Sequence, residues 1–176
     1  DHMGLLFVGG VQHAMLTGEP ARAAERTERA LAVLTAVDAG VRLLELARVG
    51  AWALAESGLL ARSAGDEAGL ARAHESLAGM QALAEERRTA LNPSGRLAEV
   101  VDREMDEIEA WRQRLEGADT ASRWDELAQA WLGLGRPYRV ASDRWHEAEA
   151  AEMAGDRDAA VAALRAAYDI AIELRA

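Results

Sequence analysis

The sequence predicts an all-α protein with about eight helices arranged as stacked antiparallel hairpins. Half of the 176 residues are hydrophobic but only 5% are aromatic, and Ala and Leu dominate the apolar part. Only three prolines interrupt the chain. Apolar residues recur at spacings of three and four, and no stretch alternates as a strand would. This composition and period favour helix and disfavour strand.

The first half of the chain predicts four helices, over about 5–17, 20–37, 41–63 and 67–91. Pro20 suits the first turn of the second helix, because a proline at that position loses no helical hydrogen bond. Asp38-Ala39-Gly40 is the turn expected before the third helix. Gly65 ends the third helix, and Asp66 is expected to cap the fourth.

The second half predicts four more helices, over about 96–115, 122–134, 137–154 and 156–174. Asn92-Pro93-Ser94-Gly95 is the strongest loop signal in the chain. Ser122 followed by Asp125 is the pattern of a capping box, which we expect to open the sixth helix. Gly135-Arg136-Pro137 and Gly155-Asp156 mark the last two turns. Because the turns are short, neighbouring helices should pack antiparallel.

Charge and composition exclude several classes of function. The net charge is -10 and the sequence pI is about 4.9, so the chain should repel nucleic acid and anionic membranes. It contains no cysteine, which excludes disulfides, thiolate nucleophiles and Cys-based metal sites and suits a reducing cytoplasm. The apolar stretch over 4–11 is far shorter than the ~20 residues that span a bilayer. We therefore expect a cytoplasmic protein.

The domain organisation predicted from the sequence is simple. Asp1-His2-Met3 has the appearance of a remnant of a cloning site, so residues 1–3 are set apart. Residues 4–176 are expected to form a single domain, because this length suits one compact core or array. The apparent cloning remnant also suggests a fragment excised from a longer protein.

Three of the five tryptophans lie within 124–145 and match a repeat pattern. Trp124-x2-Leu127-Ala128-x2-Trp131, a turn at Gly135 and Ala141-x3-Trp145-x2-Ala148 reproduce the tetratricopeptide (TPR) pattern with one extra residue at the turn. Small residues let two helices approach, and large rings fill the space beside the crossing. We therefore expect Trp124, Trp131 and Trp145 to be packing residues.

Weaker copies of the same spacing place glycines at corresponding turns, at Gly18, Gly65 and Gly155. Together these copies predict a TPR-like right-handed solenoid. The seventh segment fits both as the second helix of one repeat and as the first helix of the next. We assign it as the second helix, because that copy carries the aromatic residues.

The last fifty residues resemble a particular protein family. The resemblance rests on Trp131-Leu132-Gly133-Leu134-Gly135-Arg136-Pro137-Tyr138, on Ala154-Gly155-Asp156, on Leu164-Arg165-Ala166-Ala167 and on Ile172-Glu173-Leu174-Arg175-Ala176. These segments are similar to the C-terminal helical-repeat region of actinobacterial ATP-dependent transcriptional regulators of the LuxR type. In that family an ATPase module precedes this region and a helix-turn-helix domain follows it. The resemblance covers about a third of the chain.

The resemblance implies a sensing or protein-interaction domain and no enzyme. This chain has no phosphate-binding loop and no DNA-binding helix pair, so ATP hydrolysis and DNA contact would belong to the parent protein. By analogy with helical repeats, groove-facing partner-binding residues would be Trp52, Ala55, Leu59 and Arg62 in the third segment, and Ser122, Asp125 and Gln129 in the sixth. Trp52 could equally be a packing residue.

Two other functions remain open from the sequence. One is a regulatory module that binds a small effector in an enclosed pocket between hairpins. The other is a helical-bundle enzyme, but the chain lacks the motifs this would need. Gly133-Leu134-Gly135 is no dinucleotide fingerprint, and no HExxH or ExxH spacing occurs. His146-Glu147-Ala148-Glu149, with generic carboxylates such as Glu104 and Glu107, is the nearest approach to a metal site. We expect no cofactor and no metal.

Overall fold

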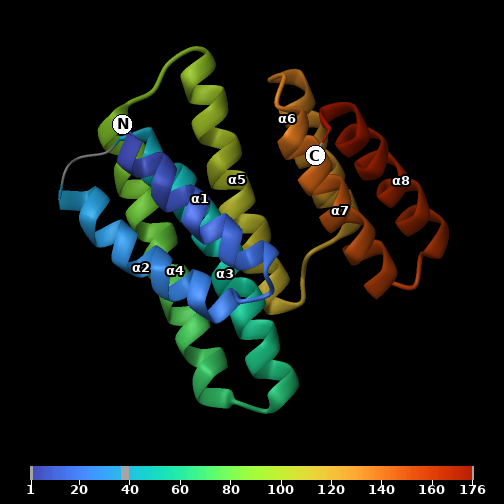
Figure 1. Ribbon diagram of the computed structural model, residues 1–176, viewed down its shortest axis with the longest axis horizontal. Helices are drawn as coiled ribbons and strands as arrows, with labels where there is room; N and C mark the ends of the chain where they lie inside the picture. Colours follow the sequence, from blue (N-terminus) through green and yellow to red (C-terminus); the bar gives the residue numbers. More distant parts are fainter. Residues whose placement is uncertain (1, 37–39, 176) are drawn as a thin grey trace. The chain divides into compact units, whose positions relative to one another are not determined.

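The computed structural model describes residues 2–36 and 40–175, and within these ranges it is built from α-helices with no strand (Figure 1). The all-α prediction is confirmed. The helices are α1 His2–Leu16, α2 Pro20–Ala36, α3 Val41–Ala64, α4 Glu67–Leu91, α5 Arg96–Glu116, α6 Ala121–Gly133, α7 Pro137–Met153 and α8 Arg157–Leu174. None of these helices is long and apolar enough to cross a membrane.

Capping residues fix most helix ends where the sequence placed them. Gly65 adopts the left-handed conformation with φ 70°, which glycine tolerates without steric cost. The Asp66 carboxylate then accepts a hydrogen bond from the Gly69 amide at 2.8 Å, and thereby starts α4. Asp156 starts α8 in the same way, through the Ala159 amide at 3.0 Å. Of the turn predicted at Asp38-Ala39-Gly40, Asp38 and Ala39 lie outside the described residues.

The predicted capping box of α6 is wrong. Thr120 is the N-cap: its backbone is extended, with φ -134°, and its hydroxyl accepts a hydrogen bond from the Arg123 amide at 3.2 Å. Ser122 lies one residue inside the helix, where its own backbone is helical and cannot adopt the extended conformation of a cap. The competing cap signal two residues earlier decides the start of the helix.

The chain divides into two compact units, and each is described by itself. The first unit comprises the residues up to Gly117 and contains α1 to α5. Its centre is α3, which packs against α1, α2, α4 and α5. Side chains that point in different directions around α3 are therefore buried, among them Leu43, Leu44, Leu46 and Val49.

Two glycines of α3 let its neighbours approach closely. A methyl group at Gly50 would overlap the Thr27 methyl of α2 and the Met80 side chain of α4. A methyl group at Gly58 would overlap the Leu115 side chain of α5 and lie 2.9 Å from Cβ of Ala73. A larger residue at either position would require the neighbouring side chains to shift.

The second unit comprises the residues from Ala118 on and contains α6, α7 and α8. Helix α7 lies between the other two and packs against both. Helix α7 was assigned to a pair with α6, and in this unit it packs against both α6 and α8. Small side chains on α7, among them Ala148, Ala150 and Ala151, are buried in these contacts.

The tryptophan prediction holds for two rings and fails for the third. Trp124 and Trp131 are fully buried, as expected of packing residues. The prediction for Trp145 is wrong: this side chain is 54% exposed, and its indole N–H donates a hydrogen bond to Glu149 at 3.1 Å. Its neighbour His146 takes the inward position instead, with its ring centroid 5.0 Å from that of Trp124. Adjacent helical positions differ by about 100° in direction, so only one of the two can point inward.

The wider organisation stays a prediction at two points. The expected single domain over 4–176 is untested by the two-unit division, because two compact units can unfold as one cooperative domain. The right-handed solenoid is also untested. Within the first unit, α3 contacts both the helices adjacent in sequence and those two places away.

Candidate functional site

The first unit has a groove of about 560 Å³ where the first turns of α2 pass over the α3–α4 hairpin. Leu54, Ser57 and Ala61 of α3 form its floor. The walls come from α2 and α4, and they consist mainly of small and acidic residues: Ala21, Ala24, Glu25, Glu28, Asp66, Gly69, Arg72, Ala73, Glu75 and Ser76. The floor segment from 54 to 61 is about 10 Å long, or about two helical turns.

The rim of the groove is acidic. Four carboxylates and one guanidinium line it, which gives a local charge of -3. Arg72 lies 3.9 Å from Asp66 in a loose ion pair, and Glu28 accepts a hydrogen bond from Ser76 across the groove at 3.3 Å. Glu75 has no ion-pair or hydrogen-bond partner among the described residues, and it is exposed. Glu25 pairs with Arg29 at 3.6 Å, so Glu75 is the rim carboxylate that offers uncompensated negative charge to solvent.

The floor of the groove offers small side chains and one unsatisfied hydroxyl. Ala24, Leu54 and Ala73 are buried, so the base of the groove is apolar. The Ser57 hydroxyl oxygen is removed from solvent and has no hydrogen-bond partner in the described part of the chain. Small residues at helical spacing on three helices permit close approach of another backbone. The groove thus combines an apolar base with an acidic rim.

The predicted partner-binding residues of α3 lie elsewhere, on the side of α3 that meets α5. Trp52 is partly buried and stacks on Trp111, with ring centroids 5.9 Å apart and planes 22° from parallel. Ala55 is fully buried, and Leu59 is partly buried. Trp52 therefore occupies a packing position, which is the alternative that the sequence left open for it.

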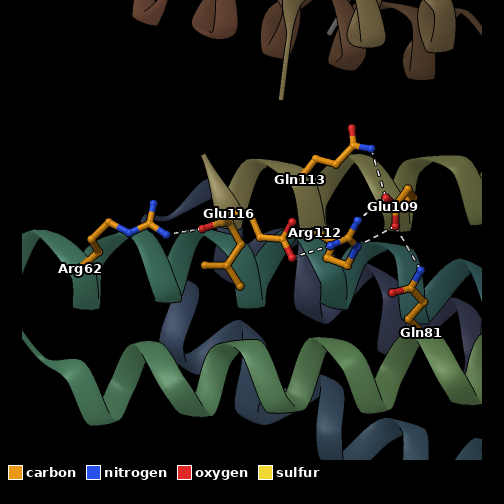
Figure 2. Close-up of polar contacts among 7 residues, drawn as sticks. Arg62, Gln81, Glu109, Arg112, Gln113 and Glu116 are labelled. Atoms are coloured by element: carbon orange, nitrogen blue, oxygen red, sulfur yellow. Dashed lines mark hydrogen bonds and ion pairs between the residues drawn. The ribbon is translucent and has the colours of Figure 1, made fainter. Parts of the chain in front are cut away.

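Arg62 reaches the C-terminal end of α5. Its guanidinium donates a hydrogen bond to the Leu115 carbonyl, which is one of the helix-terminal carbonyls without a helical partner (Figure 2). Arg62 therefore helps to terminate a neighbouring helix. Its side chain remains exposed on the other side.

The same end of α5 carries a polar network, shown in Figure 2. Arg112 binds Glu109 through two nitrogens, at 2.8 and 2.5 Å, and also reaches Glu116. Gln81 of α4 and Gln113 each donate to Glu109 at 3.1 Å. Hydrogen bonding from Arg112 is the main cause that lowers the pKa of Glu109. This network links α4 to α5, and each of its carboxylates accepts a hydrogen bond from Arg112.

Of the predicted residues of α6, Asp125 joins this helix to α7. Asp125 pairs with Arg144 at 2.5 Å, and Arg144 also pairs with Glu147 at 2.5 Å. Partial burial lowers the pKa of Arg144, but the hydrogen bonds that Arg144 donates to Glu147 and Asp125 outweigh burial and raise the pKa overall. Gln129 is exposed and donates to Asp125 at 3.4 Å, while Ser122 is exposed. A role of these residues in partner binding stays a prediction.

A buried ionic cluster joins α3 to α5. Arg48 lies 2.9 Å from Glu104 through its Nε and 2.9 Å from Glu107 through its Nη1, and the three side chains are almost completely buried. Burial raises the pKa of Glu104 to about 8, Arg48 opposes this rise, and the neighbouring Glu107 and Glu45 add to it. One guanidinium thus serves two carboxylates in a low-dielectric setting. The cluster is sealed by the helices and offers no cleft to a substrate.

The residues considered for a metal site take structural positions. Glu104 and Glu107 hold Arg48, and His146 contacts Glu149 at 3.0 Å beside the Trp124 ring. Within the described ranges, no group of three or more His, Asp or Glu side chains has a metal-binding arrangement.

Comparisons with protein-family models, with curated proteins and with solved structures gave no match to this chain. The resemblance to LuxR-type regulators therefore remains a prediction from the sequence.

Sequence reasoning missed the groove. Its walls come from segments about fifty residues apart, and their approach depends on the packing of α2 and α4 over α3. A signal did exist: Ala21 and Ala24, Ser57 and Ala61, and Gly69 and Ala73 are small residues three or four apart. Acidic residues lie beside these pairs or across from them in the groove. Small residues flanked by acidic ones are the pattern that this groove produces in the sequence.

Proposed function

We propose that this chain is a non-enzymatic helical-repeat interaction domain, and that the groove between α2 and α4 binds a basic amphipathic helix of a partner. The partner is another protein or another domain of the same parent protein. The observation that carries the proposal is the groove itself, with its small apolar base and a rim charge of -3. A helix laid into such a groove would bury small apolar side chains and direct Arg or Lys to the rim.

The form of the groove distinguishes this proposal from a small-effector site. A volume of about 560 Å³ falls within the range of small-molecule pockets. However, Ala21, Glu25, Glu28, Asp66, Arg72 and Glu75 of the lining are exposed, so this groove is open along its rim. An open acidic rim suits a long cationic partner better than a small enclosed effector. The effector-binding module remains the alternative.

Peptide binding tests the proposal. Two fluorescent 18-residue Ala-rich helical peptides would be compared, one with Arg and one with Glu on the polar face. We expect the Arg peptide alone to bind, with an affinity that falls as salt is raised, because the rim charges are exposed. Fluorescence anisotropy measures both affinities.

Matched variants show whether the groove is the binding surface. Glu25→Arg with Glu75→Arg should abolish binding of the Arg peptide. Glu99→Arg with Glu152→Arg makes the same change in net charge at exposed positions outside the groove, and it should retain most of the affinity. Equal loss in both double variants would mean attraction to the net charge of -10 and would exclude the groove. No binding by the unaltered protein would also contradict the proposal.

We further propose that the natural protein is a cytoplasmic ATP-dependent regulator of the LuxR type, in which this domain transmits a signal toward transcription. The support is the similarity of the C-terminal residues given above. The flanking sequence in the source genome tests it. An ATPase module upstream and a helix-turn-helix domain downstream are expected, and a natural chain without them would refute this assignment.

A further inference from the structure

Helix α8 carries an apolar stripe that nothing in its own unit covers. Only Ala163 and Ala167 are buried among its side chains, and these face α7. Val161, Leu164, Tyr168 and Ile172 are 40%, 54%, 65% and 59% exposed. Their spacing of three, four and four places them on one face of the helix. Figure 1 shows α8 at the edge of its unit, with α7 between it and α6.

This stripe differs from an ordinary exposed surface. Helix α8 exposes four large apolar side chains in a continuous row about 17 Å long. Such a row is typical of a helix that packs against another helix.

The charges beside the stripe indicate which helix covers it. Arg165 and Asp169 lie along the same edge of the stripe, four residues apart, and neither has an ion-pair partner among the described residues. In an antiparallel pair related by a two-fold axis, the same edge of each helix faces itself in reverse. An axis opposite residue 167 then places Arg165 of each copy against Asp169 of the other.

The same axis also aligns the apolar residues. The Val161 end of one stripe meets the Ile172 end of the other, and Leu164 and Tyr168 lie near the centre. The arrangement is therefore self-complementary in both shape and charge. We infer that α8 is a self-association surface, which pairs antiparallel with α8 of a second copy of this chain. This inference does not depend on the proposed peptide groove, which lies in the other unit.

The association should be weak. Two rows of four side chains bury less than the ~1,200 Å² of a standard interface, and the net charge of -10 on each copy opposes contact. We expect a dimer at protein concentrations of about 100 µM and a monomer at about 1 µM, which corresponds to a micromolar dissociation constant. Sedimentation equilibrium over this range measures the change in mass.

Two sets of variants test the stripe and the charge pair. Leu164→Glu should give a monomer throughout, while Leu60→Glu, at a leucine of α3 with 57% exposure, should leave the dimer intact. Arg165→Asp alone and Asp169→Arg alone should each weaken dimerisation at least tenfold, because each places like charges opposite each other. The double variant Arg165→Asp with Asp169→Arg restores both pairs and should restore the dimer.

Three results would overturn the inference. The first is a monomer at every concentration, which would mean that a different partner or the first unit covers α8. The second is a dimer unaffected by Leu164→Glu, which would place the interface elsewhere. The third is a double charge variant no better than the single ones, which would exclude the antiparallel pairing. Circular dichroism of each variant confirms that the helices remain folded.

Discussion

The two units enclose their central helices to different degrees. In the first unit, α3 is surrounded by four helices, and glycines at 50 and 58 let them approach. In the second unit, α7 touches only two helices, and buried indole rings fill the space beside it. Glycine is needed where several neighbours approach one helix closely, whereas indole rings fill spaces in both units, as Trp111 of α5 does against Trp52 of α3.

The largest effect is expected from truncation of a buried tryptophan in the second unit. Trp124→Ala should lower the free energy of unfolding by about 3–5 kcal/mol, because it removes a large buried ring and leaves a cavity. Trp145→Ala is the matched change at the exposed ring and should cost less than about 1 kcal/mol. Urea denaturation followed by circular dichroism measures both. Equal losses would contradict the opposite placement of the two rings.

The buried ionic cluster of the first unit should make stability depend on pH. The folded protein binds the Glu104 proton more tightly than the unfolded chain does, because the pKa rises from its usual 4.5 to about 8. The stabilisation from this proton is therefore complete below pH 4.5 and is lost as the pH rises toward 8. The slope is at most about 1.4 kcal/mol per pH unit.

Glu104→Gln removes this titration and serves as the control. The free energy of unfolding of the variant, relative to that of the unaltered protein, should increase steadily from pH 5 to pH 8 and then level off. Urea midpoints at several pH values measure the difference. A constant difference across this range would mean that Glu104 stays ionised in the folded protein.

A smaller effect tests the close approach of helices to α3. Gly58→Ala places a methyl group against Leu115 and Ala73 and should cost about 1–3 kcal/mol through overpacking. Gly79→Ala is the control, because a methyl group at this helical position meets no atom within 4 Å. It should stabilise the protein by up to about 1 kcal/mol. Thermal unfolding of both variants would show shifts of opposite sign, and a shared sign would refute the packing difference.

The smallest effect concerns the start of α6. Thr120→Ala removes the observed cap and should cost about 1 kcal/mol, whereas Ser122→Ala should change the free energy of unfolding by less than about 0.5 kcal/mol. Chemical denaturation distinguishes the two. A larger loss at Ser122 would restore the capping box predicted from the sequence.

The helices could be predicted from the sequence, and the surfaces could not. Local signals such as Gly65 with Asp66 fix helix ends, because the residues that act lie within one turn of each other. Trp145 was misplaced because the repeat pattern assigned it by its spacing from Ala141 and Ala148, and this spacing does not show which side of α7 the neighbouring helices cover. Trp52 and Arg62 were assigned to a free face, although α5, more than forty residues away, covers that side of α3. The groove needed knowledge of how α2 and α4 lie over α3, which no local pattern contains.

Arg48 has a consequence for how α5 is aligned along α3. Sliding α5 by one turn would move Glu104 and Glu107 by about 5.4 Å, and it would leave the buried charges of Arg48 and Glu107 and the buried Glu104 carboxyl without their partners. A purely apolar interface between α3 and α5 would tolerate such a shift, since one leucine could take the place of another. A lysine at position 48 could not bind both carboxylates in this way, because its ammonium group has one nitrogen where the guanidinium uses two. The cluster therefore fixes the alignment of α5 along α3.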